Sequence, residues 1–254
     1  MNRGSKIKEK EKASQFKTIT GASDKVATEC LRATGWSVEA AIEYFYSSGL
    51  QAAVPSVDMK GIEALFAKYK DAADGAIRAE GVGSFCEDLG VDPSDVVMLV
   101  LSWRLNAATM CEYTRDEFVG GLQRLGCDSL EKIKRRLPEM RGELKDPAKW
   151  REVYHYAFAW AKEKNQKCLQ LDVAMGMWQL LFAEERRWQY IDDWCAFLQA
   201  HHNRAISRDT WVQLFEFVRT VKPDFSNFDE SAAWPYLIDE FVDYMRQRQA
   251  VAED

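Results

Sequence analysis

Carboxylates that alternate with large aromatic residues stand out near the C-terminal end of the sequence. Residues 209–254 contain ten Asp or Glu and four Lys or Arg. The aromatic and aliphatic side chains there are expected to pack inward, which leaves the carboxylates at the surface with too few basic partners. A rigid acidic surface of this kind suits the binding of a basic protein segment. Ordinary solvated charge is the competing interpretation of the same composition.

The segment 70–81 has the length and the central glycine of a calcium-binding EF-hand loop. With Gly75 at the sixth place, however, the first and twelfth places hold Lys70 and Gly81. Calcium takes six to eight oxygen ligands, and the single carboxylate of Asp74 cannot supply them. The pattern therefore predicts an EF-hand-like helix–loop–helix unit with no metal, and we expect no cofactor. A calcium-responsive EF-hand-like adaptor is the alternative function.

Cysteines and histidines are the remaining candidates for chemistry. A cysteine hydrolase would need Cys111 or Cys127 within reach of His155, His201 or His202. Neither a strained nucleophile turn nor a phosphate-binding glycine loop accompanies them in the sequence. The six cysteines form no C-x-x-C pair, so we expect small buried thiols and no disulfide framework.

Helical periodicity runs along the chain without a convincing strand, which predicts an all-α protein. Residues 1–12 are charged and expected to be a frayed, flexible end, and residues 13–50 carry three short helical patterns. Residues 51–60, which include Pro55, are expected to form a linker. Residues 61–250 are long enough for a larger helical domain.

Capping residues predict where several helices begin. Ser37 is expected to cap the third helix of the small unit. The same rules place further starts at Asp92 with Pro93, at capping boxes Thr114–Glu117 and Asp128–Glu131, at Asp146 with Pro147, and at Pro235 as the first residue of the last helix. The run Val96–Leu101 is apolar on every side of its helix, so one face of it is a candidate groove lining.

Charge and hydropathy exclude two classes of partner. The formal net charge of −6 argues against nucleic acid as the main partner. The longest aliphatic run, Val96–Leu101, is far too short to span a bilayer, so we expect no membrane partner. A soluble intracellular protein is the expectation.

Several longer motifs carry a resemblance to one family. They are Leu99–Trp103, Asn106–Tyr113, Leu125–Ser129, Ile206–Trp211 and Ala233–Asp239. In these motifs, and over nearly its whole length, the chain resembles the DCN-like ("defective in cullin neddylation") family. Its N-terminal unit, including Thr18–Ser23, looks like the family's ubiquitin-associated (UBA-like) module. The rest resembles the family's cullin-binding "potentiating neddylation" domain, a helical fold with two degenerate EF-hand-like halves.

The resemblance implies a non-catalytic, scaffold-type ligase component found in nucleus and cytoplasm. Such a protein helps a RING partner to pass a ubiquitin-like modifier from its conjugating enzyme to a cullin lysine. The acidic patch for the cullin C-terminal region falls on Asp209, Ala233 and Asp239. The UBA-like module is a candidate ubiquitin binder through Ile19–Gly21 and the third helix, or else a stability or localisation element. An apolar pocket for the acetylated N-terminal Met of the conjugating enzyme falls on Val82, Met98, Leu101, Ala108, Cys111, Tyr113, Trp160, Met177 and Leu180.

Overall fold

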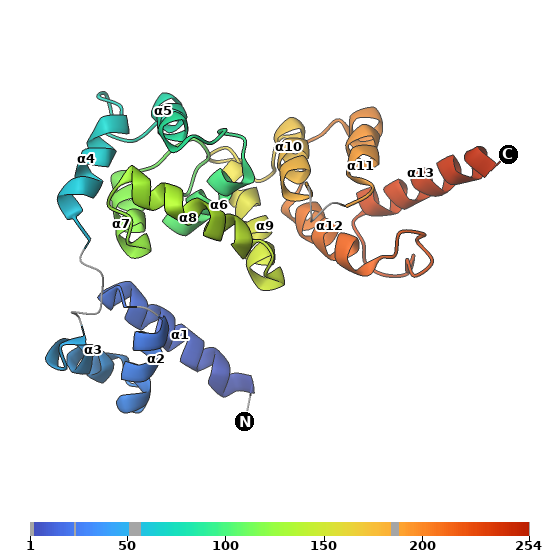
Figure 1. Ribbon diagram of the computed structural model, residues 1–254. Coiled ribbons are helices and arrows are strands. Elements are labelled where there is room, and N and C mark those ends of the chain that lie inside the picture. Colours follow the sequence, from blue (N-terminus) through green and yellow to red (C-terminus); the bar gives the residue numbers. More distant parts are fainter. Residues whose placement is uncertain (1–2, 23, 51–56, 184–187, 254) are drawn as a thin grey trace. The chain divides into compact units, whose positions relative to one another are not determined.

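The computed structural model describes residues 3–22, 24–50, 57–183 and 188–253 (Figure 1). Within these residues the secondary structure is helical apart from three isolated β-bridges, so the all-α prediction is confirmed. None of the described helices is long and apolar enough to cross a membrane. Most of the predicted linker lies outside the described residues, and the domain limits stay a prediction.

The chain divides into two compact units. One consists of Met1–Ile62 with Leu122–Asp128, and the other of Glu63–Gly121 with Ser129–Asp254. The predicted acidic-patch and pocket residues all belong to the second unit.

Three helices form the N-terminal bundle, α1 (Arg3–Thr20), α2 (Asp24–Ala33) and α3 (Val38–Ser47). Helix α1 begins at Arg3, so the segment that we expected to be frayed is helical, in keeping with the good helix propensity of its Lys and Glu residues. The edge-to-face contact between Phe16 and Phe45 lies in a small core that also contains Ala22, Ala27, Cys30, Leu31 and Ala41.

Two helix–loop–helix units pair at the start of the larger domain. Their helices are α4 (Met59–Tyr69), α5 (Ala79–Leu89), α6 (Val96–Leu105) and α7 (Arg115–Leu125). The loops meet in an antiparallel bridge, in which the amide of Ile77 donates to Tyr113 over 2.9 Å and the amide of Tyr113 donates to Ile77 over 3.0 Å. Gly75 has the positive φ of 73° that the loop's turn requires.

A second pair repeats this arrangement. Its helices are α9 (Pro147–Ala161), α10 (Leu171–Leu181), α11 (Ile191–Phe197) with the π-helical turn η3 (Leu198–His202), and α12 (Arg208–Thr220). Leu169 and Ile206 form the corresponding antiparallel bridge, with N–O distances of 2.9 and 2.7 Å. Helix α8 (Leu130–Glu143) lies between the two pairs in the sequence, and α13 (Tyr236–Glu253) ends the chain. The two EF-hand-like halves expected from the resemblance are therefore present as bridged helix–loop–helix pairs.

An aromatic cluster fixes α12 against α9 and α10. The ring of Trp211 stacks on Trp178 with centroids 5.0 Å apart and on Tyr154 with centroids 4.8 Å apart. The Tyr154 hydroxyl accepts a hydrogen bond from Trp178 Nε1 and donates one to the carbonyl of Trp211, over 2.8 and 2.9 Å. Because these buried polar groups satisfy one another, the start of α12 has a fixed position in the domain.

Three predicted helix starts are confirmed. Ser37 accepts a hydrogen bond from the amide of Ala40, and Asp146 accepts bonds from the first amides of α9 with Pro147 as its first residue. Thr114 and Glu117 form both bonds of the capping box, since each side chain accepts from the other residue's amide. The fourth start differs by one residue, because α13 begins at Tyr236 and Pro235, expected as its first residue, directly precedes it.

Two predicted caps are wrong by one to three residues. Asp95 caps α6, whereas Asp92 accepts from the amide of Ser94 in the preceding turn. Asp95 is also paired with Arg141 of α8, and such a tertiary partner favours the later start. At α8 the cap is Ser129 instead of Asp128, so the expected second box does not form there.

Candidate partner-binding surfaces

Two of the predicted cullin-binding residues lie at helix starts. Asp209 is in the first turn of α12, whose cap Ser207 accepts a hydrogen bond from the amide of Thr210 over 3.0 Å. Asp239 is in the first turn of α13. Ala233, the third predicted residue, is exposed in the segment before α13. Helix dipoles favour carboxylates at both positions.

These two helix starts border one cleft of about 440 Å³. Thr210, which follows Asp209, lines the cleft from α12, and Leu237, two residues before Asp239, lines it from α13. The side chain of Tyr236 also lines it and is 74% exposed. The cleft is also lined by the polar or charged side chains of His201, His202, Arg204 and Glu240, and the two predicted carboxylates lie next to it, not in its wall.

Three basic residues of the C-terminal region, Arg219, Arg246 and Arg248, form ion pairs with carboxylates other than Asp209 and Asp239. The three ion pairs are Arg219 with Glu216, Arg246 with Glu230 and Arg248 with Asp193. Within the described residues, no Lys or Arg forms an ion pair with Asp209 or Asp239. Both predicted cullin-binding carboxylates are thus left for an external basic group.

The carboxylate of Asp239 is held in an unfavourable environment. Its Oδ1 atom is buried, and no hydrogen-bond donor of the described residues reaches it. Burial raises the pKa of this carboxyl above its usual value, and the negative charges of Asp243 and Glu230 raise the pKa further. A cation brought by a partner would stabilise the charged carboxylate and so offset these effects.

The nine predicted pocket residues differ in accessibility. Tyr113, Met98 and Leu101 are buried in the core, and Val82 and Trp160 are almost as buried. Met177 and Leu180 are partly exposed, whereas Ala108 and Cys111 are exposed. The nine residues come from α5, α6, the loop between α6 and α7, α9 and α10.

That one face of Val96–Leu101 lines a groove stays a prediction. Every residue from Val97 to Leu101 is buried, because α6 packs against both α8 and α9. A helix that contacts neighbours on several sides is apolar all round for that reason.

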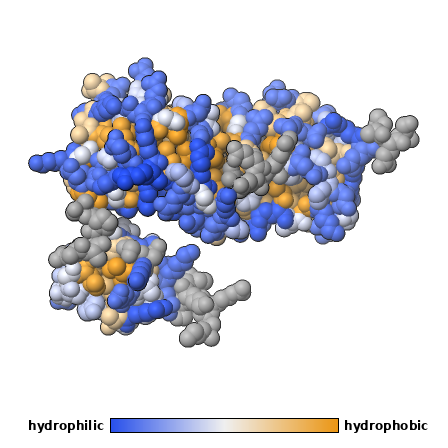
Figure 2. All heavy atoms as spheres, viewed as in Figure 1, coloured by the Kyte–Doolittle hydropathy of each residue, from blue (hydrophilic) through white to orange (hydrophobic). Residues whose placement is uncertain are grey.

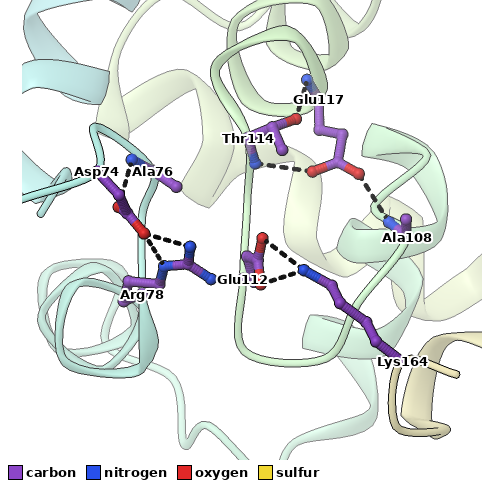
Figure 3. A network of polar contacts seen from close by, with 8 residues as sticks. All are labelled: Asp74, Ala76, Arg78, Ala108, Glu112, Thr114, Glu117 and Lys164. Atoms are coloured by element: carbon purple, nitrogen blue, oxygen red, sulfur yellow. Dashed lines mark hydrogen bonds and ion pairs between the residues drawn. The ribbon is translucent and has the colours of Figure 1, made fainter.

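A polar network holds the loop that carries three of the pocket residues (Figure 3). The carboxylate of Glu117 accepts hydrogen bonds from the amides of Ala108 and Thr114, over 2.8 and 2.7 Å, and so ties the two ends of the loop together. Glu112 lies between Arg78 and Lys164, with nitrogen–oxygen distances of 2.5 and 3.1 Å. No local sequence signal marks these partners, since they are separated by 34 and 52 residues.

The EF-hand-like loop has an internal cation in Arg78. Its guanidinium pairs with Asp74 and Glu112, which belong to the two bridged loops. The hydrogen bond from Arg78 holds the pKa of Asp74 below its usual value. Among the described residues, no three His, Cys, Asp or Glu side chains gather in a way that could hold a metal ion.

The cysteines are free thiols, and their environment opposes nucleophilic chemistry. Cys127 is buried. Cys111 is at the loop surface with a φ of 57°, and burial of its sulfur by neighbouring atoms raises the pKa of its thiol. A reactive cysteine needs a lowered pKa, so the thiolate is disfavoured here.

Large apolar side chains are exposed on the N-terminal bundle. Ile19 is 58% exposed at the end of α1, and Tyr44 and Tyr46 of α3 are 42% and 48% exposed. The face drawn in Figure 2 shows an apolar patch among polar residues on this bundle. Ile19 and α3 are the elements that the sequence predicted for ubiquitin recognition.

Known proteins are similar in sequence to most of this chain. It is 39% identical over 177 residues to "DCN1-like protein 5" of Bos taurus, a match that covers 70% of this chain and 74% of the relative. The chain belongs to the DCN1-like family. A match to "DCN1-like protein 3" of Xenopus laevis is 37% identical over 199 residues, which cover 77% of this chain and 65% of that relative. The resemblance seen in the sequence motifs is thereby confirmed.

Two family models agree with the DCN1-like assignment. The "Cullin binding" model matches residues 132–244, and the "UBA-like domain" model matches residues 10–51. In this DCN1-like chain the first match contains all three predicted acidic-patch residues. Of the predicted pocket it contains Trp160, Met177 and Leu180, whereas the other six residues precede it.

Proposed function

We propose that this chain promotes cullin neddylation as a non-catalytic scaffold, in nucleus and cytoplasm. It binds the C-terminal region of a cullin and the N-terminus of the conjugating enzyme of that pathway. A RING partner of the cullin takes part in the transfer of the modifier. Membership of the DCN1-like family and the match to the "Cullin binding" model support this function.

One observation carries the cullin part of the proposal. Asp209 and Asp239 lie at two helix starts that border one cleft, and neither is paired with a basic residue of the described chain. Complementary charge accelerates encounter and sets the register of two proteins. Tyr236 offers an exposed aromatic surface beside these carboxylates, and aromatic residues are common at the centre of interfaces.

The second partner of the proposal is the acetylated N-terminal Met of the conjugating enzyme. A charged N-terminal amine in an apolar pocket costs several kcal/mol, whereas acetylation removes that charge. The exposed Ala108 and Cys111 and the partly exposed Met177 and Leu180 form the accessible part of the predicted site. The buried Met98 and Leu101 lie deeper, as the base of such a pocket.

Simultaneous binding explains how a scaffold raises the rate. Two contacts on one folded domain hold the conjugating enzyme at a high effective concentration near the cullin lysine. They also restrict its orientation, which lowers the entropic part of the transfer barrier. No residue of this chain needs to touch the reacting thioester. The exposed apolar residues of the UBA-like bundle are proposed to add a ubiquitin contact.

Charge reversal of Asp209 tests the cullin part of the proposal. The Asp209→Arg variant should bind an isolated cullin C-terminal domain at least about 10-fold more weakly, because it places repulsion where attraction is expected. Asp116→Arg is the matched control, since Asp116 is also an exposed carboxylate in the first turn of a helix, α7. Equal cullin affinity of the Asp209→Arg variant and the unaltered protein by calorimetry, at unchanged helicity, would refute the proposed role.

A further inference from the structure

The loop between α6 and α7 is held from every side by polar contacts. Its first residues are fixed by Tyr156, whose hydroxyl donates to the carbonyl of Ala107 over 2.7 Å. The amide of Met110 donates to the carbonyl of Trp160 over 2.9 Å, and Tyr113 forms the bridge to Ile77. A short exposed loop with this many contacts is pre-organised, because little entropy remains for it to lose when it binds a ligand.

Glu112 joins this loop to two other parts of the domain. Arg78, which pairs with it from one side, is the residue directly before α5. Lys164, which pairs with it from the other side, lies in the segment between α9 and α10. Figure 3 shows the carboxylate between these two cations. Only 14% of the Glu112 side chain is exposed, so solvent screens these pairs less than it screens most surface ion pairs.

The three segments that meet at Glu112 carry the walls of the proposed pocket. Val82 lies in the first turn and a half of α5, after Arg78. Cys111 and Tyr113 are the neighbours of Glu112 in the loop. Trp160 lies in the last turn of α9 before Lys164, and α10, which follows, carries Met177 and Leu180.

We propose that Glu112 is a positioning residue of the acetyl-methionine pocket. Its carboxylate sets the distance between α5, the α6–α7 loop and the α9–α10 segment by binding Arg78 and Lys164 at once. This inference rests on the proposed function of the pocket. The residue does not touch the ligand. Its effect is on the ligand affinity of the pocket and not on the distant acidic surface.

The test compares Glu112→Gln with the unaltered full-length protein. Gln keeps the shape of the side chain but removes the charge that holds both cations. Binding of an acetylated peptide with the conjugating enzyme's N-terminal sequence should weaken about 5- to 10-fold. Binding of the cullin C-terminal domain should stay within about 2-fold. Amide hydrogen exchange of residues 107–113 should accelerate in the variant.

Two further variants separate positioning from a general loss of stability. Glu139→Gln is the control, because Glu139 also forms an ion pair, with Arg136 at 3.2 Å on the exposed side of α8. This substitution should leave the affinities for peptide and cullin unchanged. In a double-mutant cycle, Lys164→Met should weaken peptide binding less in the Glu112→Gln background than in the unaltered protein. That coupling would not arise if Glu112 acted on stability alone.

Each outcome decides the inference. Unchanged peptide affinity in Glu112→Gln overturns it, and so does an equal loss of peptide and cullin binding. Additive effects of the Glu112 and Lys164 substitutions also overturn it. Failure of the unaltered protein to prefer the acetylated over the unacetylated peptide is a different result. It refutes the proposed function of the pocket and removes the inference with it.

Discussion

Replacement of Asp239 by Asn should stabilise the free protein and weaken its binding to a cullin. The carboxylate has a buried oxygen without a donor among the described residues, and two acidic side chains raise its pKa further. Its charge is therefore unfavourable in the unbound fold. The same charge is what a basic partner would neutralise, so stability and binding are expected to change in opposite directions.

The size of the effect follows from the environment of the carboxylate. A neutral amide removes repulsion from Asp243 and Glu230 and is cheaper to bury than a carboxylate. The dipole of α13 favours the charge by roughly 0.3–1 kcal/mol and offsets part of this, so we expect a net gain on the order of 0.5 kcal/mol in the free energy of unfolding. For a domain of this size that raises Tm by about 1–2 °C. Loss of the charge should weaken cullin binding by about 10-fold, equivalent to about 1.4 kcal/mol.

The pH dependence gives the prediction a second readout. A carboxyl whose folded-state pKa is raised above its unfolded value is destabilising at neutral pH. That penalty decreases as pH falls through the folded pKa, and it disappears near the unfolded value of about 3.9. The advantage of Asp239→Asn should thus be largest near pH 7 and vanish on acidification. Chemical denaturation of both proteins from pH 4 to 7.5 measures it.

Asp209→Asn is the matched control, for which we expect the opposite change in stability. Asp209 is exposed in the first turn of α12, where the helix dipole stabilises a carboxylate by roughly 0.3–1 kcal/mol. This variant should lose a little stability and also lose cullin affinity. A lower Tm for Asp239→Asn, or an advantage that persists at pH 4, would refute the account of the Asp239 environment.

Two further outcomes concern packing and titration. Gly81→Ala should lower the free energy of unfolding by about 1–3 kcal/mol, because a Cβ at Gly81 would overlap the carbonyl oxygen of Tyr69. Gly83→Ala in the same helix is the control. Its Cβ would meet no atom, so thermal unfolding should show a gain of up to about 1 kcal/mol. Burial lowers the pKa of His155 in the fold, and the charge of Arg151 lowers it further. The free energy of unfolding should therefore fall as pH drops below about 6.5. Urea unfolding from pH 5 to 7 should show a smaller fall for His155→Gln.

Local rules predicted the helices well because they depend on neighbours in the sequence. The capping box at Thr114–Glu117 needs only four consecutive residues, and both of its bonds form. The prediction at Asp92 was wrong because Asp95 is an equally good cap and has Arg141 of α8 as an additional partner. When two nearby residues are both good caps, a contact with a distant helix determines which one begins the helix. A single sequence does not show that contact.

The candidate sites likewise have features that the sequence shows and features that depend on tertiary packing. An excess of acid over base in residues 209–254 was visible in the composition, and the structure adds that Asp209 and Asp239 stand at two helix starts beside one cleft. Which members of the predicted pocket are accessible could not be foreseen, because exposure depends on how α6 packs against α8 and α9. The partners of Glu112 were also invisible, since they join segments far apart in the chain.

Arg78 offers a physical reason why the EF-hand-like pair suits the scaffold role that we propose. In a calcium sensor, the ion binds and leaves, and the angle between the helices changes with it. Here the positive charge between Asp74 and Glu112 is covalently part of the chain, so it is present at every calcium concentration. We therefore expect the bridge between Ile77 and Tyr113, and the arrangement of the helices on either side, to be independent of calcium. A scaffold benefits from this, because the effective concentration of one partner near the other is highest when the geometry between their sites does not fluctuate. Arg78→Met should therefore do more than remove an ion pair: it should leave two carboxylates facing each other across the bridged loops and loosen the side of the domain that carries the proposed pocket.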